Sequence, residues 1–166
     1  MKLIKWLKLL LCHFRYSHKY TIVDFLDDSF IAVIRCLDTR VVLRLNIEEV
    51  IANKGIISHL LPEQACFVGI KYAFALKYGF VCQSTVNHYT ADSTISFDCH
   101  HNVQFVHPIS SNNIVLPAEE IAAAKELINL FNPVGAYLIG VEAGKQKLNK
   151  QFLPNSFANI PIDNLF

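Results

Sequence analysis

The strongest constraint on the fold is that the second half of the sequence repeats part of the first. Residues 47–70 (IEEVIANKGIISHLLPEQACFVGI) align without a gap with residues 118–141 (AEEIAAAKELINLFNPVGAYLIGV), and eight of the 24 aligned positions are identical. Average composition gives only about one or two identities over such a length. The alignment therefore predicts a tandem repeat, in which one structural unit occurs twice. We call the constant difference in residue number, which places residue 47 on residue 118, the repeat offset.

The segments before the two aligned stretches are typical of β-strands. Each half contains three short runs rich in β-branched and aromatic residues, separated by Asp, Ser, Asn and His turn residues. The predicted strands cover residues 20–26, 30–36 and 41–45 in the first half, and 93–98, 102–107 and 113–116 in the second half. We therefore expect an α+β fold of two units related by a pseudo-twofold axis, each a three-stranded antiparallel sheet followed by two helices.

A chain of 166 residues is long enough for one ordinary domain or for two small units that share a core. The predicted parts are an N-terminal basic amphipathic helix at 1–20, the first repeat at 21–78, a linker at 79–91, the second repeat at 92–150 and an extended C-terminal arm at 151–166.

Local helix signals explain most of the residues that the two halves share. Asn46 is a favourable N-cap, and Glu49 follows three residues later, as in a capping box. Pro62 and Pro133 are expected in the first turn of a second helix, where a missing N–H costs nothing. Glu48 and Glu49 lie where the helix dipole favours acids, so the pair indicates a helix start rather than an acid–base catalyst.

Small residues recur at a spacing of four in both halves. The first half has Ala65, Gly69 and Ala73, and the second half has Ala136, Gly140 and Gly144. Small side chains at this spacing lie on one helical face and let another backbone approach closely. We expect the second helices of the two halves to pack on each other or on a sheet.

The charge is unevenly distributed along the chain. The net charge is +1, but residues 1–20 contain five basic residues and no acid, so the rest of the chain has a net charge of −4. A mildly acidic body argues against nucleic-acid binding. The five cysteines are scattered singly, which suits a reducing, cytoplasmic compartment and predicts no disulfide framework.

The first twenty residues predict a basic amphipathic helix with two interpretations. Apolar residues fall on one face and lysines on the other; the residues that would bind a membrane or a partner are Leu3, Trp6, Leu7, Leu10, Phe14, Lys2, Lys5 and Lys8. The helix would either pack on the protein's own core or lie on an anionic membrane or a partner. The C-terminal arm leaves a similar choice between the chain's own domain and a partner's groove, with Phe152, Phe157, Ile160 and Phe166 as contacts.

Two further groups are candidate ligand sites. Lys54 and Lys125 occupy equivalent positions and are expected to project into the apolar arc of their helices. A lysine placed there could pair with a buried carboxylate, hold an anionic ligand, or extend to solvent. Cys99, His100 and His107 are metal-ligating residue types, but adjacent histidines of a strand point to opposite faces and the spacing is not that of a zinc finger. We therefore predict neither a metal nor another cofactor.

These patterns favour a non-enzymatic, intracellular protein-interaction module, an adaptor or accessory subunit, with membrane-surface contact through the N-terminal helix. The alternative is an enzyme or small-ligand binder, metal-dependent in one version, whose pocket lies between the repeats and contains Lys54, Lys125, His100, His107 or Cys99. A protein partner is expected, and homo-oligomerisation stays open.

Overall fold

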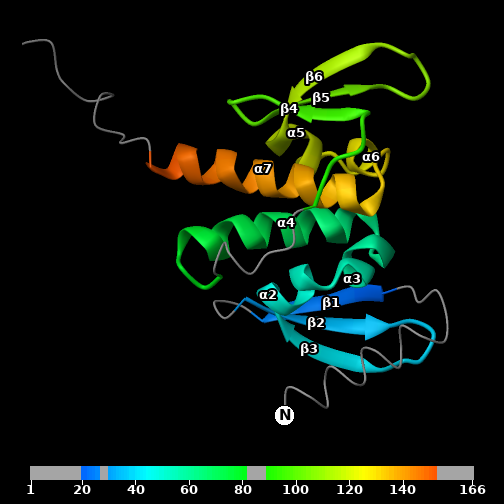
Figure 1. The fold of residues 1–166 in the computed structure, drawn as a ribbon, viewed down its shortest axis with the longest axis vertical. Helices are drawn as coiled ribbons and strands as arrows, with labels where there is room; N and C mark the ends of the chain where they lie inside the picture. Colours follow the sequence, from blue (N-terminus) through cyan, green and yellow to red (C-terminus); the bar gives the residue numbers. More distant parts are fainter. Residues whose placement is uncertain (1–19, 27–29, 82–88, 153–166) are drawn as a thin grey trace, which may run out of the picture.

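The computed structural model describes residues 20–26, 30–81 and 89–152. Side chains are described for Tyr20 and for residues 30–81 and 89–151. The fold is mixed α+β, as predicted, with two three-stranded antiparallel sheets and six helices in the described part of the chain. The sheets lie at the two ends of the molecule's longest axis, and the helices lie between them (Figure 1).

Sheet A forms one end of the molecule. It contains β1 (Tyr20–Leu26), β2 (Ile31–Cys36) and β3 (Val42–Asn46), hydrogen-bonded in this order. Side chains alternate along β2 and β3, so that every second one faces the helices. The buried members are Ala32, Ile34, Cys36, Leu43 and Leu45.

Sheet B forms the opposite end and has the same strand order. It contains β4 (Ile95–Phe97), β5 (Asn102–Val106) and β6 (Asn113–Pro117). Val103 and Phe105 of β5 are buried against the helices. All six strands coincide with predicted strands to within two residues at each end.

Each half contains three helices after its sheet, where two were predicted. In the first half these are α2 (Ile47–Ala52), α3 (Lys54–His59) and α4 (Pro62–Lys77). In the second half, they are α5 (Ala118–Ala123), α6 (Lys125–Ile128) and α7 (Pro133–Phe152). Since α7 reaches Phe152, the predicted arm begins with two helical residues.

The extra helix arises from a break in the first predicted helix. Asn53 has an extended backbone, with φ −102° and ψ 92°, and its side chain accepts hydrogen bonds from the N–H groups of Gly55 and Ile56. Ala124 has nearly the same conformation without a capping side chain. A continuous helix would carry Lys54 into the apolar face beside Val50, and the break avoids burying its ammonium group.

The predicted helix starts are confirmed. Asn46 caps α2 by accepting a hydrogen bond from the Glu49 N–H at 2.8 Å, and the Glu49 carboxylate accepts from the Asn46 N–H at 3.0 Å. Pro62 and Pro133 are the first residues of α4 and α7.

Hydrogen bonds and strand register recur at the repeat offset. Pairing of Ile31 with Asn46 in sheet A matches pairing of Asn102 with Pro117 in sheet B. The hydrogen bonds from Ile47 N–H to Phe30 O and from Ala118 N–H to His101 O also correspond. So do those from Cys36 N–H to Val41 O and from His107 N–H to Asn112 O.

The backbone conformations match as well. The non-glycine residues with positive φ in the described chain are Phe30 (50°), Arg40 (56°), His101 (62°) and Ser111 (55°). They form two pairs at the repeat offset, Phe30 with His101 and Arg40 with Ser111, both at hairpin turns. Positive φ is uncommon for such side chains, so this agreement is an observation independent of the sequence identities.

The offset changes in the first strand of each sheet. Phe25 pairs with Ala32, and Phe97 pairs with Val103, which is the equivalent of Ala32. Phe97 therefore corresponds to Phe25, and the difference between their residue numbers is one larger than the repeat offset.

Helices α4 and α7 pack directly on each other in the middle of the molecule (Figure 1). A Cβ on Gly69 would collide with the carbonyl oxygen of Tyr137, and a Cβ on Gly140 would collide with that of Cys66. A Cβ on Gly144 would lie 2.6 Å from the Cβ of Ala73. The predicted close approach through small residues is confirmed. The sequence left open whether these helices pack on each other or on a sheet, and in the structure they pack on each other.

Candidate functional site

Many of the residues predicted to bind a membrane or partner lie outside the described residues. This applies to the N-terminal set Lys2, Leu3, Lys5, Trp6, Leu7, Lys8, Leu10 and Phe14, and to Phe157, Ile160 and Phe166 of the arm. Phe152 is the last residue of α7, and its side chain is likewise outside the description. No helix in the described ranges is long and apolar enough to cross a bilayer.

The expectation that Lys54 and Lys125 project into an apolar arc is wrong. Both are exposed because the helix breaks at Asn53 and Ala124 make them the first residues of α3 and α6. The Lys54 ammonium lies 5.7 Å from the ring centroid of Tyr89, and the Lys125 ammonium lies 3.3 Å from the carboxylate of Glu63. Neither lysine faces a buried carboxylate, and the two have different neighbours.

Cys99, His100 and His107 cannot share one metal ion. Cys99 and His100 lie at the turn before β5, and His107 follows its last residue, so the strand separates them by roughly 20 Å. His107 Nδ1 accepts hydrogen bonds at 3.3 Å from the N–H groups of Ile109 and Ser110. Within the described ranges no three His, Cys, Asp or Glu side chains are grouped to hold a metal.

The turn before β5 is held by Asp98 instead. Its carboxylate accepts hydrogen bonds from the backbone and side-chain amides of Asn102 and from the N–H of His100, all at 2.8 Å. The two Asn102 hydrogen bonds contribute most to lowering the pKa of Asp98 below its usual value.

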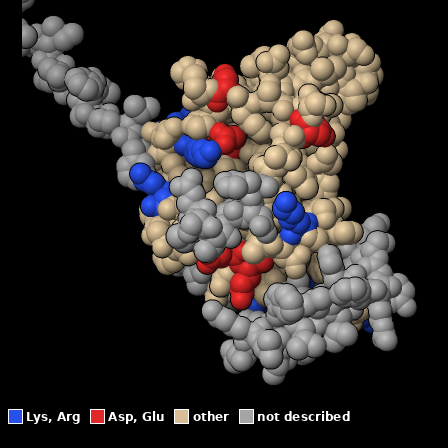
Figure 2. Space-filling model, viewed as in Figure 1, with Lys and Arg blue, Asp and Glu red and all other residues tan. Residues whose placement is uncertain are grey.

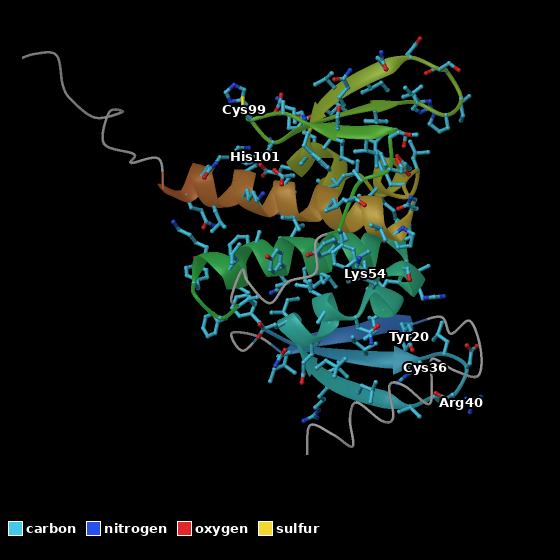
Figure 3. The ribbon with its side chains drawn as sticks, viewed as in Figure 1. Tyr20, Cys36, Arg40, Lys54, Cys99 and His101 are labelled. Carbon is cyan, nitrogen blue, oxygen red and sulfur yellow. The ribbon has the colours of Figure 1, made fainter. Side chains whose placement is uncertain are left out.

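Sequence reasoning missed a polar cluster between the turn before β5 and α7. His101 Nδ1 lies 2.5 Å from the carboxylate of Glu142, which also accepts a hydrogen bond from Lys145 at 2.6 Å. The His101 and Glu142 side chains are only 23% and 16% exposed. His101 has a positive φ of 62°, and it lies beside α7 in Figure 3. Because 41 residues separate the partners, no local pattern in the sequence announces this pair.

A shallow pocket of about 310 Å³ adjoins this cluster; its lining residues are Cys99, His100, His101, Pro117, Gln146, Asn149 and Lys150. Two of its polar side chains, Gln146 and Lys150, already serve the fold. Gln146 accepts from the N–H of Glu119 at 2.9 Å and donates to the carbonyl of His100 at 3.0 Å. Lys150 pairs with the Glu119 carboxylate at 2.6 Å. These contacts attach α5 and the turn before β5 to α7.

A second pocket, of about 400 Å³, lies between the two halves; its lining residues are Ser58, Thr90, Ala91, Asp92, Asn132, Pro133, Val134 and Gly135. None of Lys54, Lys125, Cys99, His100 and His107 lines this pocket. Asn132 accepts from the N–H of Gly135 at 2.7 Å and donates to Asp92 at 3.2 Å.

The outer faces of the two sheets differ most in surface chemistry. On sheet A, Arg35 lies opposite Val42, and Arg44 lies opposite Val33. Arg40 occupies the turn between β2 and β3, where Leu37 is 51% and Val42 49% exposed. The arginine face, as we call it here, consists of Arg35, Leu37, Arg40, Val42 and Arg44.

The corresponding face of sheet B is uncharged. Val106, Ser111 and Val115 stand at the positions that the repeat offset makes equivalent to the three arginines. Residues 101–117 contain no Asp, Glu, Lys or Arg, and Val106, Ile109 and Val115 are 51%, 86% and 57% exposed. We call the surface of Gln104, Val106, Ile109, Ser111 and Val115 the neutral face.

In Figure 2 the surface over β5 and β6 is tan, whereas blue and red atoms gather over the helices. Sequence analysis missed both faces because it used the repeat offset to find similarities. The same alignment, read for differences in charge, would have found them.

Comparison with protein-family models, with curated protein sequences and with solved structures found no match.

Proposed function

We propose that this chain is a non-enzymatic, intracellular protein-interaction module that binds different partners at its two ends. One observation carries the proposal: two outer sheet faces with the same backbone geometry have opposite chemistry, three arginines on one and Val, Ser and Val on the other. Because the same backbone accommodates either set of side chains, packing does not explain why the two faces differ. Binding of a different partner at each face explains it.

A duplication explains how the two faces came to share a geometry. In this proposal, each half descends from one unit that paired with its own copy around a twofold axis. Reciprocal contacts support this origin, since Gly69 faces Tyr137 while Gly140 faces Cys66, the equivalent of Tyr137. The matched strand register and the paired positive-φ residues support it as well.

The neutral face is the proposed protein-binding surface. The cores of protein interfaces are depleted of charged residues, and monomeric proteins rarely expose large contiguous apolar patches. The exposed side chains of Val106, Ile109 and Val115 lie on a segment without a single Lys, Arg, Asp or Glu. A partner with an apolar, uncharged patch of its own fits this surface.

The other end of the module is proposed to lie at an anionic membrane, with the basic N-terminal segment as one contact. The free thiols of Cys36, Cys66 and Cys99 fit a reducing, cytoplasmic compartment.

Site-specific photo-cross-linking tests the protein-binding surface. A photoreactive amino acid at Val115 is expected to give one discrete adduct in cells, whereas the same group at exposed Lys77 gives none. The identified partner is then purified and its affinity measured for the wild type, for Val106→Arg/Val115→Arg, and for Arg35→Val/Arg44→Val as the matched control.

The first variant places sheet A's residues on sheet B, and the control makes the reverse exchange, so both use residues that the fold accepts. We expect the first to lose at least about tenfold in affinity and the control to retain it. Equal affinity of all three proteins would refute the neutral face as the binding surface, as would adducts between two copies of the chain alone.

A second candidate function is binding of a small polar ligand in the pocket between the halves. The pocket of about 400 Å³ lined by residues of both halves is the observation that favours it. A metabolite screen by thermal shift, with Asp92→Asn as the site variant, tests this candidate. A ligand whose stabilisation disappears in the variant would support it, and a screen without any such ligand would count against it.

A further inference from the structure

The neutral face is bordered by an open edge of sheet B. β6 pairs with β5 on one side, and no strand in the described part of the chain pairs with its other side. β6 is also the strand of sheet B that lies farthest from α4 and α7 (Figure 1). An edge strand is a template for pairing with another chain unless charged side chains, Pro or a bulge prevents it.

The strand register shows which backbone groups are available at this edge. In an antiparallel pair, residues directly opposite each other exchange hydrogen bonds at every second position. His107 donates to the carbonyl of Asn112, so the residues of β6 that bond to β5 are the even-numbered ones. The N–H and C=O groups of Asn113 and Val115 therefore point away from β5, toward the open edge.

The edge strands of the two sheets differ in their protection. Val115 stands where β3 has Arg44, whose N–H also points away from the neighbouring strand. A charged side chain at such a position hinders pairing with another chain. β6 has no charged residue, and only Pro117, its last residue, lacks an N–H. The edge of sheet A is thus protected in its middle, and the edge of sheet B is not.

The inner side of the open edge is incompletely covered. Ile114 and Leu116 pack against the core but are only partly buried. Their equivalents in β3, Leu43 and Leu45, are 7% and 2% exposed. The apolar strip, as we call Ile114 and Leu116, therefore still has apolar surface to bury beside the open edge.

The helices beside the two edge strands differ in bulk. α2 packs beside β3 and contains Ile47 and Ile51. α5 packs beside β6 and has alanine at the equivalent positions, 118 and 122. The second half therefore offers less side-chain volume beside its edge strand than the first half does.

We propose that β6 binds its partner by strand addition, in which an extended, uncharged segment of the partner pairs with Asn113 and Val115 and extends sheet B by one strand. The partner residues on either side of the one opposite Val115 point to the inner side, so we expect them to be apolar and to cover the apolar strip. Because residues 101–117 contain no Asp, Glu, Lys or Arg, a charged residue in the segment would find no counterpart there. The inference rests on the proposed protein-binding role of the neutral face and adds the class of partner to it.

A second copy of the chain suits this edge less well than a flexible segment does. Only two of the five residues of β6 direct both N–H and C=O groups outward to a paired strand. A strand pair of this length between two copies buries far less than the roughly 800 Å² per partner of a stable complex. A flexible segment can pair with the edge and also extend over the apolar strip and the neutral face.

Peptide display on the full chain supplies the probe. Short random peptides are selected on the immobilised wild-type protein, and the peptide that binds most tightly is synthesised. We expect it to have apolar residues at alternate positions and no charged residue between them. Selected peptides with apolar residues at helical spacing, a selection dominated by charged peptides, or no enrichment at all would overturn the inference.

Backbone N-methylation of this peptide tests strand pairing without any change in the protein. In an added strand only every second peptide N–H faces β6. Methylation at these positions should weaken binding at least about tenfold, whereas methylation at the positions between them should change it less than about threefold. Equal loss at every position of the bound segment, or no loss at any, would contradict strand addition.

A change in the protein tests the same hydrogen bond from the other side. Val115→Pro removes the outward N–H in the middle of β6, and edge strands accept proline where the N–H faces solvent. It should bind the peptide at least about tenfold more weakly, and Val115→Ala, which keeps the N–H, should lose less. Arg44→Pro is the matched control at the equivalent position of sheet A and should bind like the wild type. If Val115→Pro does not fold, the methylated peptides decide.

Val106→Arg/Val115→Arg separates this inference from the proposed function. If this variant loses the partner identified by cross-linking while Val115→Pro keeps it, the neutral face remains the binding surface and strand addition is refuted. If both variants keep the partner, both proposals fail. Self-association of the wild-type chain that disappears in Val115→Pro would replace the partner's segment by a second copy and overturn the inference.

Discussion

The backbones of Gly69 in α4 and Gly140 in α7 touch each other at the centre of the molecule. A Cβ on Gly69 would lie 3.0 Å from the carbonyl carbon of Gly140 and 2.8 Å from the nitrogen of Val141, and a Cβ on Gly140 would lie 2.7 Å from the carbonyl carbon of Cys66. Either side chain would meet rigid backbone rather than a flexible side chain. The contact between the two halves therefore depends on glycine on both sides.

Gly140→Ala is expected to destabilise the fold by about 3 kcal/mol, because α4 and α7 must separate. In an unconstrained helix interior the same substitution would stabilise by about 1 kcal/mol, so the sign itself is diagnostic. Urea denaturation measures the effect. Gly69→Ala should destabilise the fold to a similar extent. The double variant should lose less free energy of unfolding than the two single variants together, because the first methyl group already separates the helices. A stabilised Gly140→Ala protein would contradict the contact.

Asn46→Ala should cost about 1 kcal/mol of folding stability, since it removes the side-chain half of the capping box at α2. Its equivalent in the second half, Pro117, provides no side-chain cap for α5. Asn46→Asp is the matched control, because aspartate caps as well as asparagine, and its denaturation midpoint should stay close to that of the wild type. Loss of the same stability in both variants would argue against the cap.

Thiol reactivity should separate Cys99 from the buried cysteines. Burial raises the pKa of the Cys66 thiol to about 12, and Cys36 is also buried, whereas Cys99 is exposed. At about pH 8 the Cys66 thiolate is roughly a thousandfold scarcer than that of an unperturbed thiol. Alkylation of the folded protein, followed by peptide mapping, should modify Cys99 before Cys36 and Cys66, and Cys66 only after urea unfolds the chain. Rapid modification of Cys66 in the folded protein would contradict its burial.

Alkaline pH should destabilise the fold. Burial raises the pKa values of Cys66, Tyr72, Tyr89 and Tyr137, so the folded state holds these protons more tightly than the unfolded state. The resulting stabilisation is complete below the pKa values of the unfolded chain, 9.0 for the thiol and 10.0 for the phenols, and is lost as the pH rises above them.

Urea midpoints measured from neutral pH upward should therefore fall above about pH 9. Tyr137→Phe removes one of the ionisable groups and should make the decline shallower. A stability that is constant through this range, or a decline that is equally steep in the variant, would show that these hydroxyl and thiol groups are not buried.

The strands, the capped helix starts and the close approach of two helices could be predicted because local patterns encode them. Alternation of side chains, Asn46 with Glu49, and small residues spaced by four need no knowledge of distant residues. The break at Asn53 could not be predicted in this way. Ala124 breaks in the same manner without a cap, so tertiary packing determines the break and with it the exposure of Lys54.

The candidate sites were harder to predict because they join residues far apart in the chain. The pair of His101 and Glu142 spans 41 residues, and Cys99 and His107 lie near each other in sequence yet at opposite ends of β5. The two sheet faces required both the repeat and the strand register. Arg44 and Val115 become comparable only when the repeat offset is known and both side chains are known to point outward.

Hydrogen exchange on the full chain, alone and with the partner cross-linked at Val115, tests most directly the claim that the chain is an interaction module. We predict slower exchange of backbone amides in β5 and β6 (residues 102–117) on binding, with no change around Ser58, Asp92 and Asn132. Protection confined to that pocket, or no protection of residues 102–117, would contradict the account.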